Sequence, residues 1–159
     1  GWEEPTVAKL KGDYTVYSTP VPGSGSVLTL ILNIMNNLLT SDEELLWHRV
    51  IESFKHAYGY RTQLGDLDFT PEAKEVFETM IDPEFAKSIA ELKVFDNTTF
   101  TDFEYYGGNF SSPKDSGTAN MAVLHPSGDA VTVTSTVNSY FGCKVRSPST
   151  GIILNDEMD

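Results

Sequence analysis

Cysteine, positive charge and long apolar runs are all scarce in this sequence. Its single cysteine, Cys143, excludes an internal disulfide, and its three histidines do not stand with it at the spacing of a zinc site. Only 11 Lys and Arg oppose 23 Asp and Glu, and the formal net charge of -12 disfavours nucleic acid and anionic lipid as partners. The longest apolar run, Val27–Met35, contains Thr29 and Asn33 and is far shorter than the roughly 20 residues of a membrane-spanning helix.

What is present is enough for one ordinary domain with a core, or for part of one, since 40% of the 159 residues are hydrophobic. Asn97 and Asn109 each begin an Asn-x-Ser/Thr sequon in a polar stretch typical of a surface loop. Both are therefore candidate N-glycosylation sites. We expect an extracellular or cell-surface protein of the secretory pathway, whose signal or anchor segment lies upstream of Gly1.

The first half of the chain has helical periodicity. A short strand is predicted at 14–19, followed by a turn rich in proline and glycine, and apolar spacing then predicts a buried helix over 27–38. Ser41 followed by Glu44 is a capping-box pattern that opens a second helix, which we expect to end near Leu64.

Farther along, the pattern changes from helices to strands. Pro71 and Pro83 suit the first turns of two short amphipathic helices, and residues 95–114 lack periodicity, as expected of a long irregular and mobile connection. Alternating residues over 119–124 and 130–136 predict a β-hairpin. Helices, a long loop and a hairpin indicate the α+β class.

Two acid–histidine pairs stand four residues apart on the second predicted helix. They are Glu44 with His48 and Glu52 with His56, a spacing that fits an acid–base or metal site. The spacing fits equally well with surface or supporting contacts, because no further carboxylate or histidine is placed nearby in the sequence.

At the start of the hairpin, Gly117 precedes Thr118. By spacing alone this pair is typical of a flexible joint followed by a β-branched residue. Several segments that occur in one order are far more specific than this pair alone: 30–34, 48–52, 57–58, 61–66, 117–119, 134–142, 144–148 and 151–159. Together they resemble the gamma-glutamyltransferase family along essentially the whole chain.

The resemblance implies part of a four-layer αββα sandwich of the N-terminal nucleophile hydrolase type. It also implies a precursor that cuts its own Gly117–Thr118 bond. Residues 1–117 would then be the C-terminal part of a large subunit, ending in a mobile loop, and 118–159 the N-terminal part of a small one, the two forming a heterodimer. Thr118 would be the nucleophile, and its freed α-amino group, with an ordinary pKa of about 7.7–8.0, would be the base.

Roles for other residues follow from the same resemblance. Thr136 would hydrogen-bond the Thr118 hydroxyl, Asn138 would hold the amino-acid end of the donor, and Glu157 would pair with its α-ammonium. We place Thr136 and Asn138 on one strand, facing the same side. The sequence departs from the family at Asn120, where histidine is frequent; a second departure, at position 156, puts aspartate where asparagine is frequent.

The implied reaction moves the γ-glutamyl group of glutathione or its conjugates onto Thr118 and then to water, an amino acid or a dipeptide, without a metal or organic cofactor. An upstream arginine and downstream serine and glycine segments of the site lie outside this sequence, so we expect the stretch alone to be inactive. Two alternatives stay open: a secreted relative without activity, and another acylase of the same superfamily. Glu157 favours a glutamyl donor.

Overall fold

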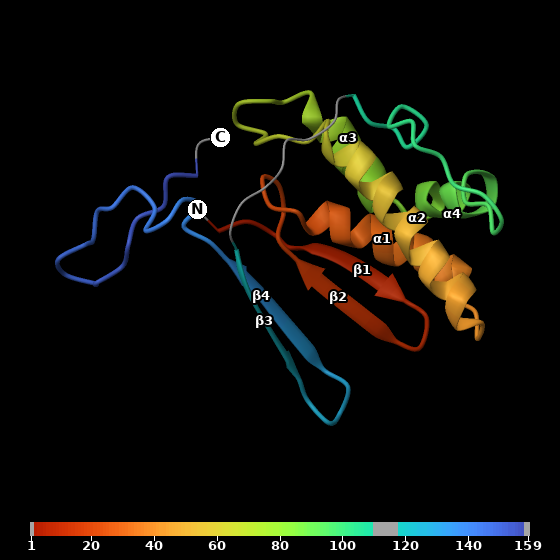
Figure 1. Cartoon of the computed structure of the whole chain (residues 1–159), viewed down its shortest axis with the longest axis horizontal. Coiled ribbons are helices and arrows are strands. Elements are labelled where there is room, and N and C mark those ends of the chain that lie inside the picture. The colour runs from red at the N-terminus through yellow and green to blue at the C-terminus, as the bar shows by residue number, and fades with distance from the viewer. Residues whose placement is uncertain (1, 110–117, 158–159) are drawn as a thin grey trace. The chain divides into compact units, whose positions relative to one another are not determined.

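The computed structural model describes residues 2–109 and 118–157 and divides into two compact units, Gly1–Ser112 and Pro113–Asp159. Helices and strands are both present, so the chain is of the α+β class (Figure 1). In chain order the elements are β1 (Thr6–Leu10), β2 (Tyr14–Ser18), α1 (Gly25–Leu38), α2 (Glu43–Arg61), α3 (Ala73–Ile81), α4 (Pro83–Leu92), β3 (Ala119–Leu124) and β4 (Ala130–Ser135).

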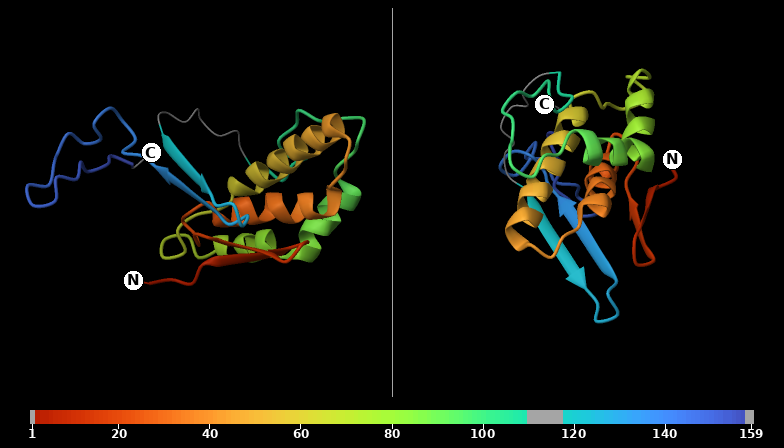
Figure 2. Two further views of the ribbon diagram at one scale, coloured as in Figure 1. Left: turned by 90° about the horizontal axis from the view of Figure 1, so that it is seen from below. Right: turned by 90° about the vertical axis from the view of Figure 1, so that its right-hand side faces the viewer.

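Helix α1 is the centre of the first unit. It contacts α2, α3, α4 and both strands of the β1–β2 hairpin, and the left view of Figure 2 shows it between α2 and that hairpin. The helix is buried on most of its sides, as its apolar sequence predicts.

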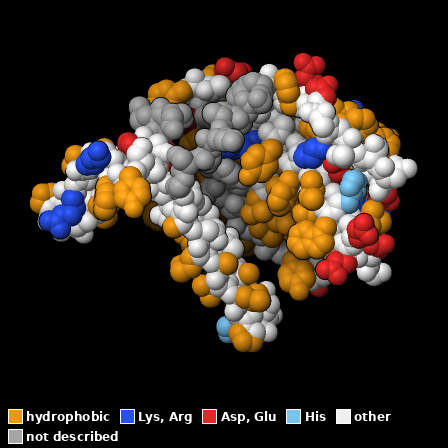
Figure 3. All heavy atoms as spheres, in the orientation of Figure 1, with side chains coloured by type: hydrophobic (Ala, Val, Ile, Leu, Met, Phe, Trp, Pro, Cys, Tyr) orange, Lys and Arg blue, Asp and Glu red, His pale blue; other side chains and the backbone are white. Residues whose placement is uncertain are grey.

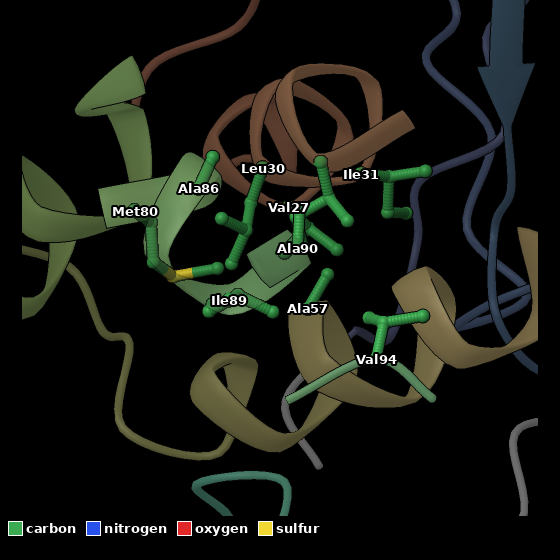
Figure 4. Close-up of a cluster of buried hydrophobic side chains, with 10 residues drawn as sticks. Val27, Leu30, Ile31, Ala57, Met80, Ala86, Ile89, Ala90 and Val94 are labelled. Carbon is green, nitrogen blue, oxygen red and sulfur yellow. The ribbon is translucent and has the colours of Figure 1, made fainter. Parts of the chain in front are cut away.

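One hydrophobic core joins all four helices of this unit. Leu30 and Ile34 from α1 and Met80 from α3 are fully buried, and Figure 4 shows side chains of α1, α2, α3 and α4 pointing toward one another. Each large apolar side chain buried in this way stabilises the fold by about 1.5–3 kcal/mol. The cluster consists of Val27, Leu30, Ile31, Ile34, Ala57, Met80, Ala86, Ile89, Ala90 and Val94.

The helix ends agree with the sequence in one case and differ in another. Pro83 occupies the first turn of α4 as predicted, and Asp82 caps that helix by accepting from the Glu84 amide at 2.9 Å. Helix α2 is capped by Asp42, which accepts from the Leu45 amide at 3.1 Å, so the predicted capping box one residue earlier is wrong. An aspartate at this position also places negative charge at the positive end of the helix.

The β1 strand is a feature that the sequence pattern did not reveal. It pairs antiparallel with β2, from Thr6 opposite Ser18 to Leu10 opposite Tyr14. The β1 residues that face inward are Thr6 and Ala8, one polar and one small, so no alternation of large apolar residues marks the strand.

The acid–histidine pair Glu52 and His56 lies inside the fold. Glu52 is 2% exposed and accepts hydrogen bonds from the Thr99 hydroxyl at 2.5 Å and the Tyr106 hydroxyl at 2.8 Å. The Lys55 ammonium lies 3.1 Å from the same carboxylate, 2.7 Å from the Tyr106 hydroxyl and 2.5 Å from the Phe100 carbonyl oxygen. Glu52, Lys55, Thr99 and Tyr106 form a polar cluster that we call the loop clamp.

The histidines of α2 also contact the loop that follows α4. The His56 ring lies 4.8 Å from the ring of Tyr106 and 5.9 Å from that of Tyr105, centroid to centroid. His48 Nε2 is 2.8 Å from the Phe95 carbonyl oxygen. Within the described ranges 2–109 and 118–157, no three His, Cys, Asp or Glu side chains are grouped to hold a metal ion. His48, Glu52 and His56 therefore make contacts that support the fold, and the metal interpretation gains no support.

Burial controls the ionisation of both groups. Burial of the Glu52 carboxyl opposes its charge, yet the hydrogen bonds from Thr99, Tyr106 and Lys55 together lower its pKa below the ordinary value. Burial lowers the pKa of His56 from 6.5 to about 4. The histidine is therefore neutral in the folded protein over the whole neutral range.

Acid is expected to destabilise the first unit through His56. Between pH 6.5 and about 4 the unfolded chain binds a proton that the folded chain does not, so stability falls as the pH falls. At about 1.4 kcal/mol per pH unit the loss across this window is about 3 kcal/mol. Urea denaturation at several pH values measures it. His56→Phe should lose this part of the slope, and His125→Asn, in an exposed turn, should keep it; an unchanged slope in His56→Phe would refute the assignment.

In the part of the chain that the structure describes, no helix combines the length and apolar character needed to cross a bilayer. Hydrophobic side chains are nonetheless plentiful at the surface of both units (Figure 3). In the first unit four of them follow one face of α2: Trp47, Ile51, Phe54 and Tyr58.

Candidate active site

The second unit is built on the hairpin of β3 and β4. The strands pair in register from Ala119 opposite Ser135 to Leu124 opposite Ala130, as the alternating sequence predicts. Thr118 directly precedes the first paired residue and Thr136 directly follows the last one. Because the strands are antiparallel, the two threonines leave the hairpin at the same end.

Asn120, a departure from the family sequence, has a clear contact in this hairpin. Its side-chain amide donates to the Thr134 hydroxyl at 3.0 Å, across the strand pair. Such cross-strand pairs stabilise a two-stranded sheet modestly.

The chain turns sharply after β4. The strand ends at Ser135, and Asn138 has a φ of 66°, a left-handed conformation that breaks an extended strand. The prediction that Thr136 and Asn138 share a strand is therefore wrong. The turn holds them close in another way, since the backbone amide of Asn138 donates to the Thr136 hydroxyl oxygen at 2.8 Å.

A second contact comes from the last described residues. The Asn138 side chain donates to the Asp156 carbonyl oxygen at 3.3 Å, and the Ser139 amide donates to the Asp156 carboxylate at 3.0 Å. Hydrogen bonds from the backbone amide and the side chain of Ser139 lower the pKa of Asp156 below its ordinary value. The bridge between Arg146 and Ile153 closes the connecting segment on itself and returns it to the turn.

A hollow of about 420 Å³ lies at this end of the hairpin. Thr118, Thr136 and Asn138 all line it, together with Ala119, Ser135, Val137, Ser139, Tyr140 and Phe141. The structure thus brings together three of the residues that the sequence singled out. A hydroxyl nucleophile in such a hollow has room for a small substrate beside it.

The other predicted site residues are placed differently. Glu157 is exposed and does not line this hollow, although its neighbour Asp156 contacts the turn. Gly117, the predicted residue before the cut, lies outside the described residues. The two sequon asparagines, Asn97 and Asn109, lie in the first unit, and both are exposed.

Sequence reasoning missed the contributions of Ser139 and Tyr140, and it noted the aspartate at position 156 without predicting its contact with the turn. Ser139 and Tyr140 line the hollow because the left-handed residue before them reverses the chain. Asp156 fastens the turn from 17 residues away in the sequence, and no local pattern reports a contact of that range. The aspartate at this position was the one signal in the sequence, and it did not indicate the partner.

Comparisons with known proteins agree with one another. A family profile described as gamma-glutamyltranspeptidase matches residues 1–159. Glutathione hydrolase 2 of Arabidopsis thaliana is 42% identical over 161 residues, covering 99% of this chain and 27% of that protein. The human glutathione hydrolase 5 proenzyme is 34% identical, covering 92% of this chain and 26% of that protein.

Solved structures give the same result. The crystal structure of Helicobacter pylori gamma-glutamyltranspeptidase is similar with a TM-score of 0.52 and 30% identity, over 62% of this chain and 29% of that chain. The chain thus spans about a quarter of the length of the curated relatives that it matches.

Proposed function

The chain belongs to the gamma-glutamyltranspeptidase family, and from this premise we propose that the protein containing it cleaves the γ-glutamyl bond of glutathione and its conjugates. Thr118 would attack the γ-carbonyl carbon, form an acyl-enzyme ester and release the remaining dipeptide. Water, an amino acid or a dipeptide would then take the glutamyl group. The observation that carries this proposal is the position of Thr118 and Thr136 in one hollow at the end of the hairpin.

Thr118 would become reactive by cutting the chain before it. Its hydroxyl oxygen attacks the Gly117 carbonyl carbon, the bond from that carbon to the Thr118 nitrogen breaks, and the hydroxyl proton passes to the departing amine. Water hydrolyses the resulting ester. The free α-amino group then serves as the base for the same hydroxyl, because its ordinary pKa of about 7.7–8.0 suits neutral pH. This cut would separate a large subunit ending at Gly117 from a small one.

Neighbouring residues would position the nucleophile and the donor. Thr136 would hydrogen-bond the Thr118 hydroxyl, and Asn138 would contact the amino-acid end of the glutamyl group; their shared turn and hollow support both roles. Glu157 would pair with the α-ammonium. Its place beside Asp156, which binds the same turn, is compatible with that role. The two units would belong to a four-layer αββα sandwich of the N-terminal nucleophile hydrolase type.

Selectivity for the γ-linkage tests this function. The whole protein, incubated with glutathione, should release glutamate, and the isomer in which glutamate is linked through its α-carboxyl group should yield none. The reason is that the α-linked isomer keeps its α-ammonium but has its α-carboxyl group in the amide bond, so only the γ-linked substrate presents both groups for recognition. Chromatography of free glutamate measures both reactions. Equal release from the two isomers, or none from either, would reject the proposal.

We also propose that Asn97 and Asn109 carry N-linked glycans on a secreted or cell-surface protein. Both asparagines are exposed, as attachment of a glycan in the mature protein requires. A loss of mass on treatment of the natural protein with an N-glycosidase would support this, and an unchanged mass would argue against it.

A further inference from the structure

The loop clamp joins helix α2 to the segment that leads toward Thr118. We propose that it positions this segment for self-cleavage, so that Glu52, Lys55, Thr99 and Tyr106 are positioning residues of the maturation step. The inference rests on the proposed function, because it concerns the cut before Thr118.

The clamp holds the loop at two separated points. Thr99 and Tyr106 both donate to the Glu52 carboxylate, and the Tyr106 hydroxyl also accepts from the Phe100 amide at 3.0 Å. Lys55 adds an ammonium that lies 4.3 Å from the centre of the Tyr106 ring. A buried carboxylate with three donors is strongly directional, since each charge-assisted hydrogen bond is short and oriented.

Contacts beyond the clamp join the two residues that directly follow α2 to the last described residues of the loop. The Gln63 side chain donates to the Gly107 carbonyl oxygen at 2.7 Å, and the backbone amide of Asn109 donates to the Thr62 hydroxyl at 3.0 Å. At Gly59 the loop backbone comes so close that an added Cβ would lie 2.1 Å from the Tyr106 carbonyl oxygen. The loop from Thr99 to Asn109 is therefore fastened to α2 and to the two residues that follow it.

This attachment is close in sequence to the bond that would be cut. Only eight residues, 110–117, separate Asn109 from Thr118 in the sequence. Attack within a chain is fast when the reacting atoms are held about 3–3.5 Å apart. Fixing one end of a short tether removes conformations that would otherwise have to be searched. Loosening the clamp should thus slow the cut more than it affects the finished enzyme.

Neighbouring tyrosines provide a matched test in the full-length precursor. Tyr106→Phe removes the hydroxyl that bridges Glu52 and the Phe100 amide. Tyr105→Phe removes a hydroxyl that donates to the Lys93 carbonyl oxygen at 2.8 Å, outside the clamp. The decay of uncut precursor is followed by gel and intact mass. We expect Tyr106→Phe to cut about 10- to 100-fold more slowly and Tyr105→Phe to stay within about twofold of wild type.

A second pair of variants tests the clamp in case Tyr106→Phe fails to fold. Thr99→Val removes the hydroxyl that donates to Glu52, and Thr99→Ser keeps it, so slow cutting in the first and normal cutting in the second supports the clamp. Because Thr99 completes the Asn97 sequon, Asn97→Gln separates an effect of a glycan from an effect of the hydroxyl. Once cut, each variant should hydrolyse glutathione at the wild-type rate per cleaved molecule, which a general packing defect would not allow.

Three outcomes would overturn the inference. Tyr106→Phe and Thr99→Val cutting at the wild-type rate would show that the clamp has no part in maturation. Equal slowing in Tyr105→Phe, or an equal loss of activity in the cleaved molecules, would show a general packing effect. A wild-type precursor that never cuts itself would reject self-cleavage, and the inference with it, whereas normal wild-type cutting beside unaffected clamp variants rejects the inference alone.

Discussion

Replacing Thr118 with alanine in the whole protein is expected to leave an uncut chain and to lower glutathione hydrolysis by about 10⁴-fold or more. Alanine lacks the hydroxyl oxygen that would form both the ester of self-cleavage and the glutamyl ester of turnover. Thr118→Ser keeps that oxygen and should keep both reactions at a reduced rate. Gel analysis of the chain and chromatography of released glutamate measure the two effects.

Thr132 offers a control of the same chemistry in the same hairpin. It lies in β4 opposite Ala122, away from the end where the hollow forms, and its side chain is exposed. Thr132→Ala should therefore cut itself and hydrolyse glutathione nearly as wild type does. Enzymes that lose their nucleophile keep far less than a tenth of their activity. If Thr118→Ala retained more than about a tenth of wild-type activity, Thr118 would therefore not be the nucleophile.

Among the substitutions considered, Glu52→Ala is expected to lower the stability of the fold most. Glu52→Ala leaves the Thr99 and Tyr106 hydroxyls and the Lys55 ammonium without the carboxylate that they share. Removing one partner of a buried ion pair typically costs about 3–5 kcal/mol; because Lys55 is 31% exposed and keeps other acceptors, we expect about 3 kcal/mol. Urea denaturation in the uncut Thr118→Ala background measures it.

Glu78 in α3 is the matched control for this substitution. It is also a helical glutamate paired with a lysine, at 3.7 Å from Lys74, but its side chain is 62% exposed. Exposed pairs contribute about 0–1 kcal/mol, so Glu78→Ala should change stability little. Equal losses in the two variants would show that the buried network around Glu52 does not stabilise the fold.

Local patterns were sufficient for most helices and for the second hairpin. The apolar spacing of α1, the proline at the start of α4 and the alternation of β3 and β4 each encode their element within a few residues. Strand β1 escaped notice because its inward residues, Thr6 and Ala8, are polar or small. The loop clamp could not be foreseen either, since its partners in α2 and in the loop are 44 to 54 residues apart.

In the candidate site, too, one part follows from local sequence and another depends on tertiary structure. The register of the hairpin is enough to bring Thr118 beside Thr136, so that part follows from the sequence. The turn at Asn138 depends on a left-handed backbone conformation that an asparagine tolerates but does not dictate. Asp156 reaches the turn through a long segment, and this contact depends on tertiary structure.

The most direct test of the account is N-terminal sequencing with intact-mass analysis of the purified full-length protein, beside its Thr118→Ala variant. We predict two fragments in the wild type, one of them beginning Thr118-Ala119-Asn120, and a single chain in the variant. A folded wild-type protein that stays uncut, or is cut at another bond, would contradict the assignment of Thr118 as a nucleophile freed by self-cleavage.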